Sequence, residues 1–175
     1  MGRNKLMLPY GGKTVIEWTL MNALRNSDRV VVVTGFEREK ILPILEKYPV
    51  ETRFNPDYEK GQKTSSLVAM AGIDDDTAFL PGDMPLVEDS IWREGKRLLG
   101  EKKPSRPFWG EDLGSPVFVP GHMMEGLRNT PLPFKKYLKE NGIVLFQGTP
   151  LSVFDIDTPE RYERLLDHEI VADNP

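Results

Sequence analysis

The chain has 175 residues, of which 39% are hydrophobic and 29% are charged, a composition typical of one globular domain with a buried core. Its formal net charge of −4 argues against a protein that binds nucleic acid irrespective of sequence, because that class needs a basic face. The sequence has no cysteine, which excludes disulfides and thiolate chemistry and favours a cytoplasmic setting, and it has no apolar run of the ~20 residues that cross a membrane.

Helical and strand-like segments alternate along the chain. Thr14 and Glu17 have the spacing of a capping box, which predicts a helix that begins there. Val30–Val33 is a continuous β-branched run, typical of a strand covered on both faces. Pro43 is expected to kink or restart the helix predicted over residues 37–48. The remaining predicted helices cover residues 64–73, 88–99, 122–128, 134–140 and 158–170, and the remaining predicted strands cover 50–54, 77–80, 107–109, 116–119, 143–147 and 152–156.

This alternation predicts the α/β class. Repeated strand-helix units favour a single Rossmann-like domain over residues 1–175, with a mostly parallel sheet that has helices on both faces. No internal repeat or linker divides the sequence.

The most informative motif is the strand that ends at Pro81-Gly82-Asp83. Open α/β sheets bind their ligands at the carboxyl ends of the strands, where this aspartate lies. Gly82 permits a close approach of the backbone, and the Asp83 carboxylate suits Mg²⁺, which takes one or two acidic ligands together with substrate phosphates. The ordinary alternative is a Gly-Asp turn, and the motif alone does not decide between the two.

The amino-terminal loop offers a second candidate site. Lys5 follows Gly2 where a loop can surround phosphates, and a lysine there can neutralise charge on a leaving pyrophosphate. The later Gly11–Thr14 segment is not a phosphate-binding P-loop, because Met7 stands where that motif needs a glycine. The alternative for Lys5 is an exposed surface lysine.

Two further segments carry polar groups. Gly61 and Gln62 precede a predicted helix whose first turn includes Ser65 and Ser66, donors that suit a nucleobase or a phosphate, or simply helix caps. Asp155 and Asp157 share one face of a predicted strand end, where either can complete a metal site with Asp83, although Asp157 is also a normal residue at a helix start.

Taken together, these motifs resemble those of the molybdenum cofactor cytidylyltransferases, and more loosely those of the molybdenum cofactor guanylyltransferases. The resemblance lies in their order along nearly the whole chain. The matching motifs are Met1-Gly2-x-x-Lys5, Gly11-Gly12-Lys13-Thr14, Val30–Gly35, Asn55-Pro56 with Gly61-Gln62 and Ser65-Ser66-Leu67, Gly82–Val87, Gly114-x-Pro116-Val117 and Asp155–Glu160.

The resemblance implies a Mg²⁺-dependent nucleotidyltransferase that moves a nucleoside monophosphate from a triphosphate to a phosphorylated acceptor and releases pyrophosphate. It implies that Lys5 and Asp83 are catalytic, with Lys5 on the triphosphate. It implies metal ligands at Asp83 and at Asp155 or Asp157. Nucleotide contacts are implied at Gly2, Lys5, Gly61, Gln62, Ser65, Ser66 and Gly82. CTP is favoured over GTP, and the expected acceptor is a small molecule of the molybdopterin type.

The sequence departs from the family pattern at two places. Leu113–Pro116 replaces an Arg-Gly-His-Pro segment expected to face the acceptor, so a sugar phosphate or a cobinamide-type phosphate is an alternative acceptor. Only the tail of the glycine-rich first loop is present, and the family's central first strand is absent, which predicts an open sheet position. Three explanations of the missing strand are open. The first codon given is internal to a longer gene, a later segment fills the gap, or the chain is a family relative that binds its ligand without catalysing a reaction. The oligomeric state is not predicted.

Overall fold

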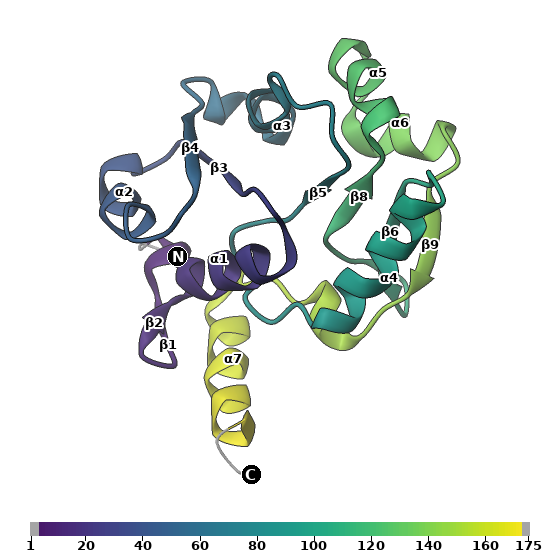
Figure 1. Cartoon of the computed structure of the whole chain (residues 1–175). Coiled ribbons are helices and arrows are strands. Elements are labelled where there is room, and N and C mark those ends of the chain that lie inside the picture. The colour runs from purple at the N-terminus through teal and green to yellow at the C-terminus, as the bar shows by residue number, and fades with distance from the viewer. Residues whose placement is uncertain (1–3, 173–175) are drawn as a thin grey trace.

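The structure is a computed structural model that describes residues 4–172 and their side chains as far as residue 167. Its amino-terminal half starts with a 3₁₀ turn and a two-stranded hairpin, and then alternates helices and strands (Figure 1). These elements are η1 (Lys5–Met7), β1 (Pro9–Tyr10), β2 (Lys13–Thr14), α1 (Val15–Asn26), β3 (Val31–Thr34), α2 (Arg38–Leu45), β4 (Glu51–Phe54), η2 (Tyr58–Lys60), α3 (Gln62–Met70) and β5 (Thr77–Phe79).

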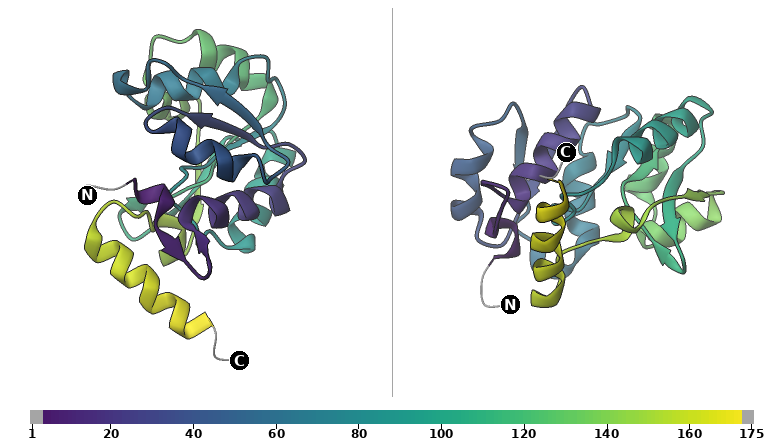
Figure 2. Two further views of the ribbon diagram at one scale, coloured as in Figure 1. Left: turned by 90° about the vertical axis from the view of Figure 1, so that its left-hand side faces the viewer. Right: turned by 90° about the horizontal axis from the view of Figure 1, so that it is seen from below.

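In the carboxy-terminal half, the described residues form four helices, four short strands and two 3₁₀ turns. The last helix projects from the body of the molecule (Figure 2). These elements are α4 (Asp89–Gly100), β6 (Ser105–Trp109), β7 (Asp112–Leu113), β8 (Val117–Val119), η3 (Gly121–Met123), α5 (Met124–Asn129), α6 (Phe134–Glu140), β9 (Val144–Gln147), η4 (Pro150–Val153) and α7 (Pro159–Ala172).

The predicted α/β class is confirmed, but the sheet is mixed rather than mostly parallel. The β3–β4 and β6–β9 pairs are parallel. The β1–β2, β5–β8, β6–β7 and β6–β8 pairs are antiparallel. Within the larger group, the tight turn at residues 110–111 makes β6 and β7 antiparallel, and β8 returns between β5 and β6 antiparallel to both. The predicted strands did not reveal these directions.

Apart from the β1–β2 hairpin, the described strands form two separate groups instead of one continuous sheet. The β3–β4 pair stands apart from the five-stranded group, whose order is β5-β8-β6-β7 with β9 paired to β6. In Figure 1 the β3 and β5 ribbons lie apart, and residues of both strands line one cavity.

Helices cover both faces, as expected. On one side, α1 and α2 pack against β3 through a core that includes Ile16, Leu20 and Leu45. On the larger sheet, α4 covers one face through Trp92 and Phe118, while α3, α5 and α6 cover the other. Burial of these side chains supplies most of the driving force for folding, because it removes their apolar surface from water.

Polar contacts of α1 join the two groups of strands. The Thr19 hydroxyl donates to the Gly82 carbonyl oxygen at 3.0 Å, and the Asn22 amide donates to the carbonyl oxygen of Val87. The Trp92 indole donates to the Asn22 side-chain oxygen at 2.5 Å. Thr19 and Asn22 are both buried, so these bonds satisfy groups that would be costly to leave unpaired.

Local sequence signals explain both the successes and the errors in the predicted elements. The capping box is confirmed, since the Thr14 amide donates to the Glu17 carboxylate at 2.8 Å. The helix α2 runs through Pro43 without restarting. The strand predicted over residues 152–156 is wrong, because Thr149 and Ser152 cap each other and close the 3₁₀ turn η4 instead. No described helix is long and apolar enough to cross a membrane.

The packing of α4 against β8 gives a stability prediction. A Cβ atom at Gly95 would lie 2.1 Å from the Phe118 ring, so Gly95→Ala should lower the free energy of unfolding by about 1–3 kcal/mol despite the higher helix propensity of alanine. A Cβ atom at Gly100, in the same helix, meets nothing within 4 Å. Gly100→Ala is therefore the control and should leave stability unchanged or slightly raised. Urea denaturation measures both; equal effects of the two substitutions would contradict the packing described here.

Candidate active site

The site begins at the turn that follows β5. Gly82 and Asp83 lie just beyond the strand, and the Gly82 carbonyl is fixed by Thr19 of α1. A Cβ atom at Gly82 would approach Ile16 to 3.1 Å and Leu6 to 3.4 Å, so the lack of a side chain permits the close packing of this turn on α1 and η1. The Asp83 side chain is only 11% exposed. A carboxylate with so little solvent needs a cationic or hydrogen-bonding partner.

Lys5 is that partner. Its ammonium lies 2.5 Å from the Asp83 carboxylate and also contacts the Asp157 carboxylate. Asn4 caps the 3₁₀ turn that carries Lys5 by accepting from the Leu6 amide at 3.1 Å. Partial burial of Lys5 opposes its charged form, but hydrogen bonds to Asp157 and Asp83 outweigh burial and raise the pKa of Lys5. The lysine is therefore protonated throughout the neutral pH range.

The segment before α7 brings two acidic residues to the same place. Ile156 is fully buried, and its amide donates to the Asp83 carbonyl oxygen at 3.2 Å, which docks the segment against the Gly82–Asp83 turn. The hydrogen bond from Lys5 lowers the pKa of Asp157. Burial and then the neighbouring Asp157 raise the pKa of Asp155, although Asp155 forms an ion pair with Arg161.

The start of α3 forms another wall. Gly61 precedes the helix with a φ of 102°, a conformation that favours glycine, and no atom would lie within 4 Å of a Cβ there. Buried Asn55 donates to the hydroxyls of Thr64 and Ser65 at 3.0 and 2.9 Å, and so fixes the first turn. Asn55 therefore positions the first turn of α3. It belongs to the Asn55-Pro56 motif, from which the sequence predicted no role for this side chain.

Arg106 of β6 fixes the loop that follows β7. Its side chain is buried and donates from Nε and Nη2 to the Gly114 carbonyl oxygen at 3.0 and 2.6 Å. Burial lowers the pKa of Arg106. A Cβ atom at Gly114 would lie 2.3 Å from the Ser152 carbonyl oxygen, so only glycine fits. The sequence predicts a basic loop over residues 102–106 that either supplies positive charge to the acceptor or is a solvated linker, and it did not reveal that Arg106 belongs to β6.

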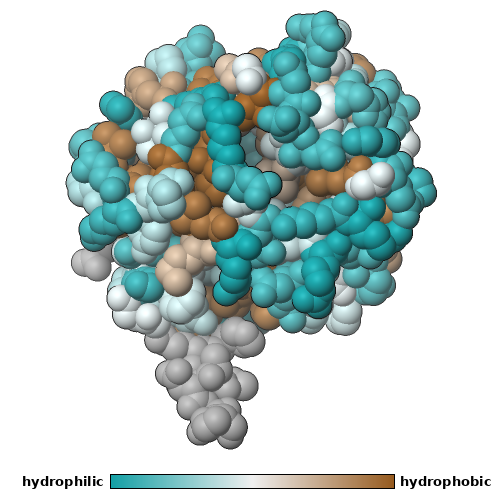
Figure 3. Space-filling model, viewed as in Figure 1, coloured by the Kyte–Doolittle hydropathy of each residue, from teal (hydrophilic) through white to brown (hydrophobic). Residues whose placement is uncertain are grey.

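A cavity of about 2,280 Å³ connects these segments, and the space-filling view shows hydrophobic surface around its mouth (Figure 3). Lys5, Gln62, Ser65, Ser66, Gly82, Asp83 and Asp155 line it. Two predicted residues lie beside the cavity but do not line it: Gly61 precedes Gln62 in the chain, and Asp157 contacts Lys5. Gly2 lies outside the described residues. The cavity thus collects most of the predicted site residues from four separate segments.

The carboxylates of the site are held by cations rather than by one another. Across residues 4–167, no cluster of three or more His, Cys, Asp or Glu side chains is arranged to hold a metal ion. Asp83 and Asp157 share the Lys5 ammonium, and Asp155 is paired with Arg161. The described arrangement therefore contains two carboxylates that converge on one cationic position.

Comparison with known proteins gives the family. Residues 1–136 match the MobA-like NTP transferase domain. The chain is 32% identical over 99 residues to the molybdenum cofactor cytidylyltransferase of Escherichia coli, a match that covers 54% of this chain and 50% of that protein. It is 30% identical over 118 residues to a probable molybdenum cofactor guanylyltransferase of Methanosarcina acetivorans, covering 62% and 51%. The chain thus spans about half the length of these curated relatives.

Solved structures show the same fold. A nucleotidyl transferase from Methanothermobacter has a TM-score of 0.79 at 22% identity, over 97% of this chain and 86% of that chain. A Mycobacterium tuberculosis protein crystallised with manganese has a TM-score of 0.71 at 19% identity, over 95% and 93%. These matches extend beyond residue 136 and include the segment that carries Asp155 and Asp157.

The shared ammonium gives a prediction about pH. At pH 7, Lys5→Met should lower the free energy of unfolding by about 1–2 kcal/mol, because it leaves Asp83 and Asp157 close together without a cation. The pKa of Asp157 is lowered in the folded state, so its stabilisation is present above the unfolded value of 3.8 and is lost as the pH falls through the folded pKa. The effect of the substitution should therefore shrink at about pH 2.5.

Lys60→Met is the matched control, because Lys60 pairs with Asp57 at 2.8 Å on an exposed surface. It should change stability by less than about 0.5 kcal/mol at either pH. Chemical denaturation at the two pH values measures both variants. An effect of Lys5→Met that persists unchanged in acid would contradict the electrostatic explanation.

Proposed function

Because the chain belongs to the MobA-like NTP transferase domain family, we propose that it transfers a nucleoside monophosphate from a nucleoside triphosphate to a phosphorylated acceptor. Residues 1–175 would act as one nucleotidyltransferase domain, with CTP as the preferred donor, in the cytoplasm. One observation carries the proposal: Lys5, shared between Asp83 and Asp157, lies on the wall of the cavity that Gln62, Ser65 and Ser66 also line.

Lys5 is suited to bind the triphosphate. Its raised pKa keeps it charged, and its side chain is 34% exposed, so phosphate oxygens can reach it from the cavity. In the proposed reaction an acceptor phosphate oxygen bonds to the α-phosphorus, the bond from that phosphorus to the bridging oxygen breaks, and pyrophosphate leaves. A cation beside the leaving group stabilises the charge that develops there, and no covalent enzyme intermediate is required.

A divalent cation fits the carboxylates of this site. Asp83 and Asp157 both contact the Lys5 nitrogen, so their carboxylate oxygens are close enough to bind one metal ion between them. In this proposal the Lys5 side chain moves to the triphosphate and leaves that position to the metal. Mg²⁺ takes one or two carboxylates and completes its shell with phosphate oxygens and water, and when bound it neutralises phosphate charge. Asp155 would add negative charge from beside them, and the manganese complex of the mycobacterial structure supports a divalent ion.

The first turn of α3 is the proposed nucleotide contact. Gln62, Ser65 and Ser66 lie on the cavity wall, and the free amides of a helix start favour phosphate or carbonyl oxygens. The side chains of Ser65 and Gln62 can donate to or accept from a base, and Gly61 permits the turn that brings them there. The cytidylyltransferase relative supports CTP, and the guanylyltransferase relative supports GTP as the alternative.

The acceptor is proposed to be a cofactor precursor of the molybdopterin type, because both of these relatives are named for the molybdenum cofactor. The Leu113–Ser115 loop, which Arg106 fixes, lines the cavity beyond Asp83 and is its proposed contact. A sugar phosphate is the alternative acceptor. The break between β3 and β5 favours a second candidate function, in which the chain binds nucleotide without catalysing transfer.

Nucleotide binding tests the site directly. With Mg²⁺ present, CTP should bind to the chain more tightly than GTP, and Asp83→Ala should weaken CTP binding by about tenfold or more, because a charged ligand-binding group contributes about 1.5–3 kcal/mol. Glu101→Ala, which removes an exposed carboxylate that pairs with Arg97, is the control and should not change affinity. Isothermal titration calorimetry measures all three. Undiminished CTP binding by Asp83→Ala would exclude the proposed metal site.

Pyrophosphate release separates the enzyme from the non-catalytic binder. The chain with CTP, Mg²⁺ and molybdopterin should release pyrophosphate, and Lys5→Gln should lower kcat by about 100-fold or more, because it removes a charge that acts mainly in the transition state. Lys60→Gln is the matched control and should retain full activity. A coupled phosphate assay measures the rates. Nucleotide binding without pyrophosphate release from any phosphorylated acceptor would favour the non-catalytic alternative.

A further inference from the structure

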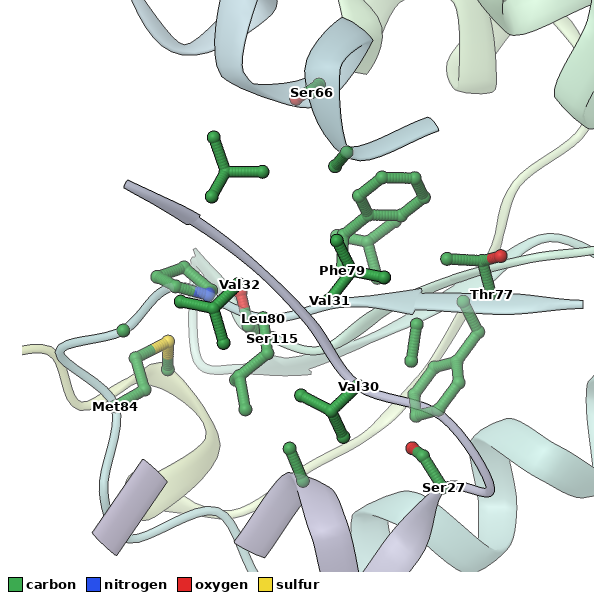
Figure 4. Close-up of a pocket in the computed structure, with 18 of the residues that line it drawn as sticks. Ser27, Val30, Val31, Val32, Ser66, Thr77, Phe79, Leu80, Met84 and Ser115 are labelled. Atoms are coloured by element: carbon green, nitrogen blue, oxygen red, sulfur yellow. The ribbon is translucent and has the colours of Figure 1, made fainter. Parts of the chain in front are cut away.

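One large aromatic side chain is exposed on the wall of the cavity. Phe36 follows the carboxyl end of β3, and it is 62% exposed, more than any other large hydrophobic residue in the described part of the chain. The cavity that it lines is bordered here by β3 and α3, which carry Val32 and Ser66 in Figure 4. The other exposed aromatic residues that the structure describes, Phe54 and Trp109, do not line the cavity.

The loop that carries Phe36 is packed closely against the 3₁₀ turn η2. A Cβ atom at Gly35 would lie 2.5 Å from the Tyr58 Cβ, so only glycine allows the backbone to approach η2 this closely. The rings of Tyr58 and Phe36 are in contact, with their centroids 6.4 Å apart and their planes at 58°. Glu37 has a φ of 51°, a left-handed conformation that is uncommon outside glycine, so the chain turns sharply directly after Phe36. The ring is thus held at a defined place on the cavity wall.

The same contacts link Phe36 to the proposed nucleotide contacts. The Asn55 amide donates to the carbonyl oxygen of Thr34, two residues before Phe36, at 2.9 Å. The Asn55 side chain donates to the Ser65 hydroxyl, also at 2.9 Å. Tyr58, which touches the Phe36 ring, begins the turn that precedes α3. Both connections place Phe36 beside the first turn of α3, on the wall where the nucleotide is proposed to bind.

The two exposed phenylalanines of this region differ in what covers their rings. The Arg38 guanidinium lies 5.1 Å from the centre of the Phe54 ring, so a cation of the chain already covers it. Among the described residues, the one aromatic ring or cation in contact with Phe36 is the tilted ring of Tyr58. An exposed π-face in a ligand cavity suits a planar heteroaromatic group, whereas a phosphate gains nothing from an apolar ring.

We propose, on the basis of the transferase function proposed above, that the nucleobase of the bound triphosphate stacks on Phe36. Stacking on an aromatic side chain tolerates every base, because each base has a π-face. The base also covers apolar surface that otherwise faces water. Phe36 therefore contributes affinity for CTP and GTP alike, and the hydrogen-bonding groups of Gln62 and Ser65 make the choice between the two bases.

The test compares ligands with and without a base. Isothermal titration calorimetry in Mg²⁺ measures the affinities of CTP, GTP and inorganic tripolyphosphate for the unsubstituted chain and for Phe36→Ala. The substitution should weaken CTP and GTP binding by about tenfold or more, because base stacking is lost, and should leave tripolyphosphate binding unchanged. Phe54→Ala is the matched control, since it removes an exposed phenylalanine outside the cavity lining, and it should change none of these affinities.

Phe36→Trp gives an optical readout of the same contact. Tryptophan offers a larger π-face, so this variant should bind CTP at least as tightly as the unsubstituted chain. Its fluorescence should change when CTP is added and the base stacks on the indole. Tripolyphosphate should cause no such change. An equal fluorescence response to both ligands would contradict stacking.

The outcomes separate this assignment from the proposed function. If CTP binds equally well to Phe36→Ala and to the unsubstituted chain, the stacking assignment is overturned and the nucleotide site stands. Equal weakening of CTP and tripolyphosphate would also overturn the assignment, because the ring would then support the fold of the site rather than the base. If neither nucleotide binds to the unsubstituted chain, both proposals fail.

Sedimentation distinguishes another occupant of this surface. The unsubstituted chain and Phe36→Ala should sediment alike, because the ring is covered by a nucleotide and not by a protein. A dimer that Phe36→Ala converts to a monomer, with the affinity for CTP unchanged, would show that a second copy covers the ring and would overturn the assignment.

Discussion

The structure depends on how α1 holds the β3–β4 pair to the five-stranded group. Among the described residues, no main-chain hydrogen bonds pair a strand of one group with a strand of the other. Thr19 and Asn22 use one face of this helix to bind the carbonyl oxygens of Gly82 and Val87, and Trp92 completes the contact from α4. These bonds fix the turn after β5 relative to η1. The distance between Lys5 and Asp83 is thus set by packing on α1, and the candidate site exists only while that packing is intact.

The electrostatics of the site follow from this geometry. Asp83 is nearly buried, Asp157 is mostly exposed, and the Lys5 ammonium between them is favourable to both. The acidic segment is anchored by the hydrogen bond of the Ile156 amide as well as by the ion pairs of Asp155 and Asp157. A site built in this way can exchange one cation for another without a change of fold, which is what the binding of a metal and a triphosphate requires.

Much of this architecture could be predicted from the sequence. The capping box of α1, the valine run of β3 and the turn at Gly82–Asp83 are local signals, and each lies where it was expected. The order of motifs predicted the family, which the match over residues 1–136 confirms. The association of Lys5, Asp83 and Asp157 depends on contacts between residues more than 70 positions apart. The local pattern suggested only that Asp155 or Asp157 could join Asp83, and the resemblance to a family placed Lys5 in the same site.

Other features were beyond sequence reasoning for identifiable physical reasons. Antiparallel pairing of β8 with both β5 and β6 depends on where a short strand returns, which its own composition does not specify. The 3₁₀ turn η4 replaces a predicted strand because side-chain caps at Thr149 and Ser152 compete with extended backbone. The role of Arg106 depends on two carbonyl groups that become neighbours only when β6 and β7 pair.

The most direct test of the central claim is to map which backbone amides respond when CTP and Mg²⁺ are added, by NMR of the isotopically labelled chain. The account predicts shifts that cluster at the start of α3, at Gly82 and Asp83, and at Lys5 and Asp157, with little change on the exposed surface of α4. Shifts confined to other surfaces would contradict the assignment of this cavity as the nucleotide site.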